Sequence, residues 1–100
     1  MRIWIDDVRI APSGYYWLKS VNEAKKFFQA ITRFNWSKIE LIDIDHDAGD
    51  FAYDGGDYIK LLDWFEEVNC NVPIHIHSLN PVGVENMRRI IQKNGWTEVR

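Results

Sequence analysis

The sequence of 100 residues is poor in the features that mark specialised classes of protein. Its single cysteine, Cys70, excludes an internal disulfide and any zinc site built from several cysteines. None of its apolar runs approaches the ~18–20 residues that cross a bilayer. The N-terminal segment turns acidic at Asp6 and Asp7, too early for a secretory signal. We therefore expect a cytoplasmic protein with no membrane partner.

Proline and glycine are scarce too, at three and six residues, and no linker, repeat or low-complexity tract interrupts the chain. Hydrophobic residues, by contrast, make up 46% of the sequence and aromatic residues 14%. This composition excludes a disordered tail and a collagen-like chain. A chain of this length is long enough to bury one hydrophobic core. We expect residues 1–100 to form a single domain.

Negative charge is concentrated in one segment. The chain holds 12 Lys and Arg against 15 Asp and Glu, for a net charge of −3. Residues 43–57 alone contain six Asp and no Lys or Arg. Carboxylates this crowded are costly unless they share a cation or a proton, although a solvated acidic loop would have the same composition. No run of Lys and Arg offers a surface for duplex DNA.

Short apolar strands alternate with amphipathic helices along the chain. We expect strands at residues 2–6, 15–18, 39–44, 72–77 and 96–99. We expect helices at residues 21–34 with Ser20 as cap, at 56–68 with Asp54 as cap, and from Asn80-Pro81 to Gly95. The alternation predicts a parallel sheet covered on both faces. Residues 7–14 are too few for a crossover helix, so either that helix is reduced to a loop or residues 15–18 are not a normal inner strand.

Polar and titratable residues follow three of the expected strands at their carboxyl ends, where open α/β sheets bind ligands. They are Asp6 and Asp7 after the first strand, Asp45, His46 and Asp47 after the third, and His75, His77, Ser78 and Asn80 at the end of the fourth. Each has an ordinary structural explanation when taken singly. Their convergence on one edge of the sheet favours a functional site.

The residue types at this edge suit a cation beside a phosphate. Carboxylates are the ligands that Mg²⁺ prefers, while a nitrogen from His46 or His77 would suit Mn²⁺ or Zn²⁺. His75 and His77 point to one face of their strand, and His77 is nearer its end, which makes His77 the better candidate for proton transfer. Ser78 and the first backbone N–H groups after Asn80 are candidates for phosphate binding.

Three motifs occur in order along nearly the whole chain. They are Ile3-Trp-Ile-Asp-Asp-Val-Arg9, Asp45-His-Asp47 followed by Gly49-Asp50, and His75-Ile-His-Ser-Leu-Asn-Pro81 followed by Gly83. Together they resemble the cyclic-phosphate processing receiver-like domain family, an offshoot of the response-regulator receiver fold. The resemblance implies an α/β, flavodoxin-like three-layer sandwich with a parallel five-stranded sheet in the order 2-1-3-4-5.

The resemblance also implies a metal-dependent pocket that acts on the cyclic phosphate of a nucleotide or of an RNA end. Asp6 and Asp7 match the acidic pair that holds Mg²⁺ in receiver domains. Asp45 matches the phosphoacceptor position, and Ser78 matches the hydroxyl residue after the fourth strand. Residues 96–99 lack the lysine that ordinary receivers place before a proline, so we do not expect phosphorelay signalling.

We predict from these residues a metal-dependent phosphoesterase. Its metal ligands are Asp6, Asp7 and Asp45, its catalytic residues are His77 assisted by His46 or Asp47, and its phosphate-binding residues are Arg9, His75, Ser78 and Asn80. The alternatives are a module that binds a phosphorylated nucleotide without cleaving it, a receiver-like domain phosphorylated on Asp45, and a purely structural adaptor. The sequence leaves open the oligomeric state and the roles of Asp43 and of residues 54–57.

Overall fold

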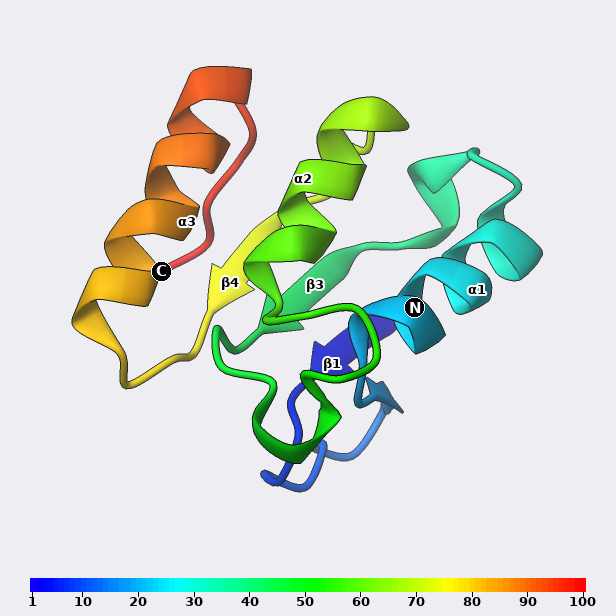
Figure 1. Ribbon diagram of the computed structural model, residues 1–100. Helices are drawn as coiled ribbons and strands as arrows, with labels where there is room; N and C mark the ends of the chain where they lie inside the picture. The colour runs from blue at the N-terminus through cyan, green and yellow to red at the C-terminus, as the bar shows by residue number, and fades with distance from the viewer.

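The computed structural model describes all residues 1–100 and shows an α/β fold (Figure 1). Its strands are β1 (Arg2–Ile5), β2 (Tyr15–Leu18), β3 (Leu41–Ile44) and β4 (Ile74–Ile76). Its helices are α1 (Val21–Thr32), α2 (Ile59–Glu67) and α3 (Pro81–Asn94), with the 3₁₀ turns η1 (Trp36–Lys38) and η2 (Gly49–Phe51). None of the helices has both the length and the apolar character needed to span a bilayer.

The four strands form one sheet in the order β2-β1-β3-β4, and all neighbours are parallel. In this register Ile3 of β1 lies between Tyr16 of β2 and Ile42 of β3. The order confirms the first four places of the expected receiver topology. Residues 6–14 join β1 to β2 without a helix, which confirms that the first crossover is reduced to a loop.

The expected fifth strand is not formed. Residues 97–99 run beside β4, but they make only one isolated parallel bridge, between Ile74 and Glu98. The N–H of Val99 donates to the carbonyl of Ile74 at 2.7 Å. The Glu98 carboxylate pairs with the Arg88 guanidinium of α3 at 2.8 Å. This segment is therefore held by a few hydrogen bonds and an ion pair to the neighbouring helix, but it does not form a β-ladder with β4.

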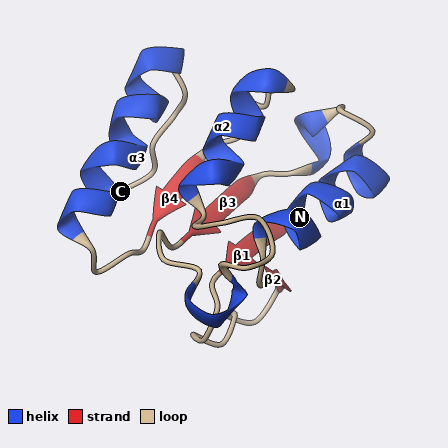
Figure 2. Ribbon diagram, in the orientation of Figure 1, coloured by secondary structure: helices blue, strands red, loops and turns tan.

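The three helices lie side by side on one face of the sheet (Figures 1 and 2). Ile3, Ile42 and Ile74 face them and are buried, whereas Trp4 and His75 lie on the other face and are only half-buried. The expectation of a three-layer sandwich is therefore wrong. Right-handed crossovers place the helices after β2 and after β3 on the same face. The connection that runs the opposite way, from β1 to β2, is the loop, so no helix covers the second face.

Local sequence signals set most of the helix ends. The Ser20 hydroxyl accepts a hydrogen bond from the N–H of Glu23 at 3.0 Å at the start of α1. The Asn80 side chain accepts one from the N–H of Gly83 at 3.0 Å at the start of α3. Gly95 ends α3 with a left-handed φ of 66°, a conformation that costs glycine little.

Asp54 does not cap α2, contrary to expectation. The two glycines that follow it, residues 55 and 56, both have positive φ and turn the chain, so α2 begins only at Ile59. The Asp54 carboxylate instead accepts hydrogen bonds from the Ser20 hydroxyl at 2.6 Å and from the Asn22 amide at 3.2 Å. Asp54 therefore ties the β3–α2 loop to the first turn of α1.

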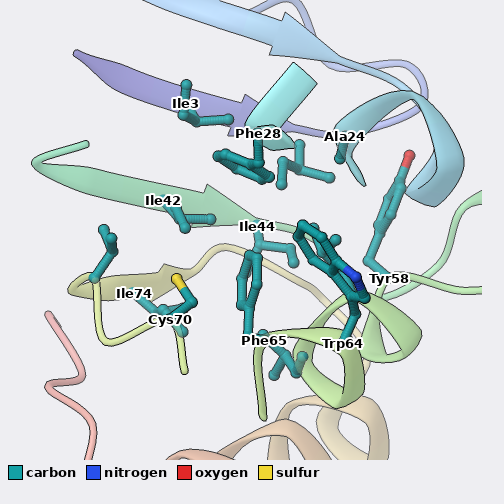
Figure 3. Packing of buried hydrophobic residues seen from close by; sticks show 14 of the residues in the cluster. Ile3, Ala24, Phe28, Ile42, Ile44, Tyr58, Trp64, Phe65, Cys70 and Ile74 are labelled. Carbon is teal, nitrogen blue, oxygen red and sulfur yellow. The ribbon is translucent and has the colours of Figure 1, made fainter. Parts of the chain in front are cut away.

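The hydrophobic core lies between the sheet and the helices (Figure 3). Isoleucines from β1, β3 and β4 meet aromatic rings from α1 and α2. Phe28 packs edge-on against Phe65 with ring centroids 5.7 Å apart, and Trp64 packs against the same ring at 5.9 Å. Each fully buried large side chain contributes about 1.5–3 kcal/mol to folding. This packing holds the carboxyl ends of β1, β3 and β4 in fixed relative positions.

Candidate functional site

Side chains that follow β1, β3 and β4 meet at one edge of the sheet. Ligand atoms of Asp6, Asp45 and His77 all lie within 4.8 Å of one another. All three residues are buried or half-buried. The structure therefore brings together three predicted site residues that are far apart in the sequence. The structure shows no pocket at this edge.

Asp6 is fully buried, and its carboxylate accepts four hydrogen bonds. Oδ1 accepts hydrogen bonds from the N–H groups of Val8 at 2.9 Å and Arg9 at 2.8 Å. Oδ2 accepts from the Arg9 guanidinium at 3.2 Å and from His77 Nε2 at 2.8 Å. Burial alone would raise the pKa of Asp6, but these donors outweigh it and hold that pKa below its ordinary value.

His77 lies between two carboxylates. Its Nδ1 is 2.6 Å from Asp43 Oδ1, and its Nε2 is 2.8 Å from Asp6 Oδ2. Burial would lower the pKa of His77, but the two carboxylates prevail and raise it. The ring stacks on Trp4 with centroids 3.9 Å apart and planes 3° apart, an arrangement that favours a positively charged imidazole.

Asp43 is the site residue whose role the sequence left open. Its only signal was a carboxylate in the middle of the apolar segment 39–44. Asp43 is buried on the face of β3 that no helix covers, and its carboxylate orients the His77 ring. The buried acid in this strand is thus the hydrogen-bond partner of His77, which lies 34 positions further along the chain.

Arg9 joins the carboxylates after β1 and β3. Its Nη1 lies 3.2 Å from Asp6 Oδ2 and 3.3 Å from Asp45 Oδ2. The other oxygen of Asp45 accepts a hydrogen bond from the N–H of His46 at 2.7 Å. The Arg9 side chain is 40% exposed, so part of its guanidinium is accessible to an incoming anion.

Asp7 lies near the cluster, but its carboxylate is outside the group whose ligand atoms lie within 4.8 Å of one another. Burial raises its pKa, and the negative charges of Asp6 and Asp45 raise it further. Its carboxylate lies against Gly49, where an added Cβ would overlap Asp7 Oδ2. Gly49 also has a left-handed φ of 52°, which glycine adopts at little cost. Because Gly49 has no side chain, the Asp7 carboxylate can lie against its backbone.

A second group of titratable side chains lies beside the first. His46 Nδ1 is 2.8 Å from Asp47 Oδ1, and this hydrogen bond lowers the pKa of Asp47. The Asn80 amide also donates to Asp47, at 3.3 Å. Asp57 lies close enough to His46 and Asp47 to share a metal ion with them. The His46 ring packs against Gly83, where a Cβ would overlap it.

The remaining predicted site residues are placed differently. His75 Nδ1 bonds to the carbonyl of Val99 at 2.8 Å, so His75 anchors the C-terminal segment and not the cluster. Asn80 caps α3 and binds Asp47, and its N–H donates to the Ser78 hydroxyl at 3.0 Å. The first turn of α3 therefore has few free N–H groups for a phosphate, because Pro81 has none and that of Gly83 is capped.

The donor set fits a divalent cation. Asp6 and Asp45 belong to the group of candidate ligands, and Asp7, whose pKa is raised by burial and then by the charges of these two residues, lies close by. Oxygen ligands of this kind suit Mg²⁺. Both nitrogens of His77 are bonded to carboxylates, so His77 adds positive charge to this group and offers no free nitrogen to a metal.

Comparison with known proteins gave one match. A family model for the cyclic-phosphate processing receiver domain matches residues 1–93, a range that includes all three motifs and every residue of the cluster. Neither the curated proteins nor the solved structures contain a match.

Proposed function

Since the chain belongs to the cyclic-phosphate processing receiver domain family, we propose that it is a metal-dependent phosphoesterase that opens the cyclic phosphate of a nucleotide or of an RNA end. The observation that carries this proposal is the meeting of Asp6, Asp45 and His77 within 4.8 Å at the carboxyl edge of the sheet. Acidic, basic and imidazole groups in one partly buried cluster are what phosphoryl chemistry requires.

In this proposal Asp6, Asp7 and Asp45 hold the divalent cation, with Mg²⁺ as the first choice. Such an ion, when bound, polarises a phosphoryl oxygen and lowers the pKa of a bound water. The Arg9 guanidinium contacts the phosphate with the donors that Asp6 and Asp45 do not use. The hydroxyl of Ser78 accepts from Asn80 and keeps its own hydrogen for a phosphate oxygen.

His46 and His77 differ in which of their ring nitrogens are free of hydrogen bonds. Both nitrogens of His77 are bonded to carboxylates, whereas His46 uses only Nδ1, toward Asp47. We therefore assign proton transfer to His46 Nε2, with Asp47 orienting the ring. This reverses the order of the two histidines in the sequence-based prediction. His77 serves as a fixed positive charge beside the phosphate.

The reaction then adds one water molecule to the ring. As the water oxygen forms its bond to phosphorus, His46 Nε2 accepts the proton of that water. The ring P–O bond breaks, and the protonated His46 returns the proton to the departing ribose oxygen. The product is an open phosphate monoester with a free hydroxyl. General acid–base help of this kind contributes about 10²–10⁴-fold in rate.

Turnover assays test this proposal directly. The protein is incubated with 2′,3′- and 3′,5′-cyclic nucleotides and with an RNA that ends in a 2′,3′-cyclic phosphate, with Mg²⁺ or Mn²⁺. We expect a monoester product and a loss of at least about 100-fold in His46→Ala and Asp45→Asn. Asp63→Asn, an exposed position on α2, is the matched control. Absence of turnover for every compound with both ions would reject the phosphoesterase.

A module that binds a cyclic phosphate without cleaving it is the second candidate. It is favoured by the way in which His77, Arg9, Asp6 and Asp45 already neutralise one another. In that case the ligand is recovered intact after tight binding, and His46→Ala binds it as well as the unchanged protein does. Loss of the ligand to a monoester would exclude this candidate.

A further inference from the structure

Exposed hydrophobic residues are concentrated in the segments that carry the site residues. Five of the eight large hydrophobic residues that the structure exposes lie in the loops that carry the site or in the first turn of α3. Each is between 71% and 85% exposed, and they are called here the apolar rim: Val8, Ile10, Tyr53, Leu79 and Val82. Single exposed apolar residues are common on any protein, but a concentration on one edge indicates a binding surface.

The apolar rim alternates with site residues along the chain. Val8 lies between Asp7 and Arg9, and Leu79 lies between Ser78 and Asn80. Tyr53 belongs to the loop between β3 and α2, which begins with Asp45. Each of the three loops that carry Asp6, Asp45 and His77 therefore also carries at least one exposed apolar side chain.

Lys and Arg are almost absent from the same loops. Residues 6–14, 45–58 and 77–80 contain seven Asp, no Lys, and Arg9 as their single Arg. Arg9 is already shared between Asp6 and Asp45. An RNA chain brings one negative charge with each nucleotide, and proteins that bind such chains supply Lys or Arg along the backbone. This edge would repel every phosphate after the first.

We propose that the site takes a free cyclic mononucleotide in preference to the end of an RNA chain, and that the apolar rim contacts its base. This inference rests on the proposed function and narrows its substrate class. A nucleobase has a flat, weakly polar face that packs on apolar and aromatic side chains, and Tyr53 supplies a ring for stacking. A mononucleotide adds no further phosphate that would have to lie against the acidic loops.

The experiment compares two probes that share one reacting group. They are 2′,3′-cyclic AMP and a short single-stranded RNA that ends in adenosine 2′,3′-cyclic phosphate. We measure kcat/KM and, by calorimetry, Kd for both, at low and at physiological salt. The expected result is a preference for 2′,3′-cyclic AMP of about tenfold or more that widens at low salt, where repulsion of the RNA is screened least.

Variants of the apolar rim test the contact with the base. Tyr53→Ser and Leu79→Ser are expected to raise KM and Kd for 2′,3′-cyclic AMP about fivefold to tenfold, the loss associated with one stacked base, with kcat little changed. Phe34→Ser is the matched control, because Phe34 is a half-exposed aromatic residue beyond the end of α1. Thermal unfolding shows whether each variant is folded.

The outcomes separate this inference from the proposed function. Equal or better use of the RNA, or rim variants that bind 2′,3′-cyclic AMP as the unchanged protein does, would overturn the inference and leave the phosphoesterase intact. If neither probe is bound or cleaved, the proposed function fails and the inference fails with it. Tight binding of 2′,3′-cyclic AMP without cleavage, weakened by the rim variants, supports the inference on a non-catalytic site.

Discussion

At the scale of the residue, His77 is constrained on three sides. Asp43 and Asp6 bond to its two nitrogens, and Trp4 stacks on its ring. A positive imidazole in this position neutralises part of the charge that Asp6, Asp7 and Asp45 place at the edge of the sheet. The arrangement therefore favours the ionised form of Asp6.

Replacing Asp43 tests this arrangement. Asp43→Asn leaves an uncharged oxygen beside His77 Nδ1, so we expect a lower pKa for His77 and a loss of about 2 kcal/mol in the free energy of unfolding. NMR titration of the imidazole and urea unfolding at pH 6 measure the two effects on metal-free protein. An unchanged His77 titration in Asp43→Asn would contradict the role given to Asp43.

The shifted pKa values of His77 and Asp6 predict how stability depends on pH. The pKa of His77 is raised by folding, so its contribution is complete below about pH 6.5 and is lost as the pH rises through the folded pKa. The pKa of Asp6 is lowered, so its contribution is complete above about pH 4 and is lost as the pH falls through the folded pKa. We expect His77→Gln to flatten the decline on the alkaline side in urea unfolding.

At the scale of the element, the start of α3 positions His46. Asn80 caps the helix and also holds Asp47, while Gly83 leaves room for the His46 ring. One turn of helix thus orients both members of the His46–Asp47 pair. The well-capped start of α3 therefore restricts the freedom of a catalytic pair that belongs to another loop, the one after β3.

Replacement of Gly83 separates helix stability from site geometry. In Gly83→Ala the new Cβ displaces the His46 ring, while alanine favours the helix by about 1 kcal/mol over glycine. We expect a Tm within a few degrees of the unchanged protein, but turnover as low as in His46→Ala. Gly95→Ala is the control: no atom lies within 4 Å of its Cβ, so it loses stability through its positive φ and keeps its turnover. Full turnover in Gly83→Ala would refute this account.

At the scale of the whole molecule, negative charge is concentrated at the cluster. The helices cover only one face of the sheet. The chain carries a net charge of −3, and the acidic residues gather where the strands end. Bound cations would relieve this repulsion without changing the core. Folding and cation binding should therefore be linked.

Thermal unfolding with and without a divalent cation measures this linkage. At about 100 times Kd, a cation that binds only the folded state adds about 2.7 kcal/mol, which corresponds to about 10–20 °C in Tm for a domain of this size. We expect this rise with Mg²⁺ or Mn²⁺, and its loss in Asp45→Asn but not in Asp63→Asn. A Tm that does not respond to millimolar concentrations of either ion would exclude a cation site at the cluster.

The sequence alone determined the features that depend on neighbouring residues. Strand β2 matches the expected residues 15–18, and α3 begins after Asn80 and ends before Gly95 as the capping signals predict. The motifs indicated the receiver-like family, which the match to residues 1–93 confirms. Hydrophobic periodicity and caps act within a few residues, so they can be interpreted without the fold.

Tertiary structure decided what depends on residues far apart in the chain. His77 meets Asp6 across 71 positions, and Asp54 is drawn to Ser20 across 34, so neither partner was evident from spacing. The uncovered face and the missing fifth strand follow from the direction of each crossover and from the single bridge at Ile74. Which histidine keeps a free nitrogen depends on the carboxylates that surround each ring, and only folding brings those carboxylates into place.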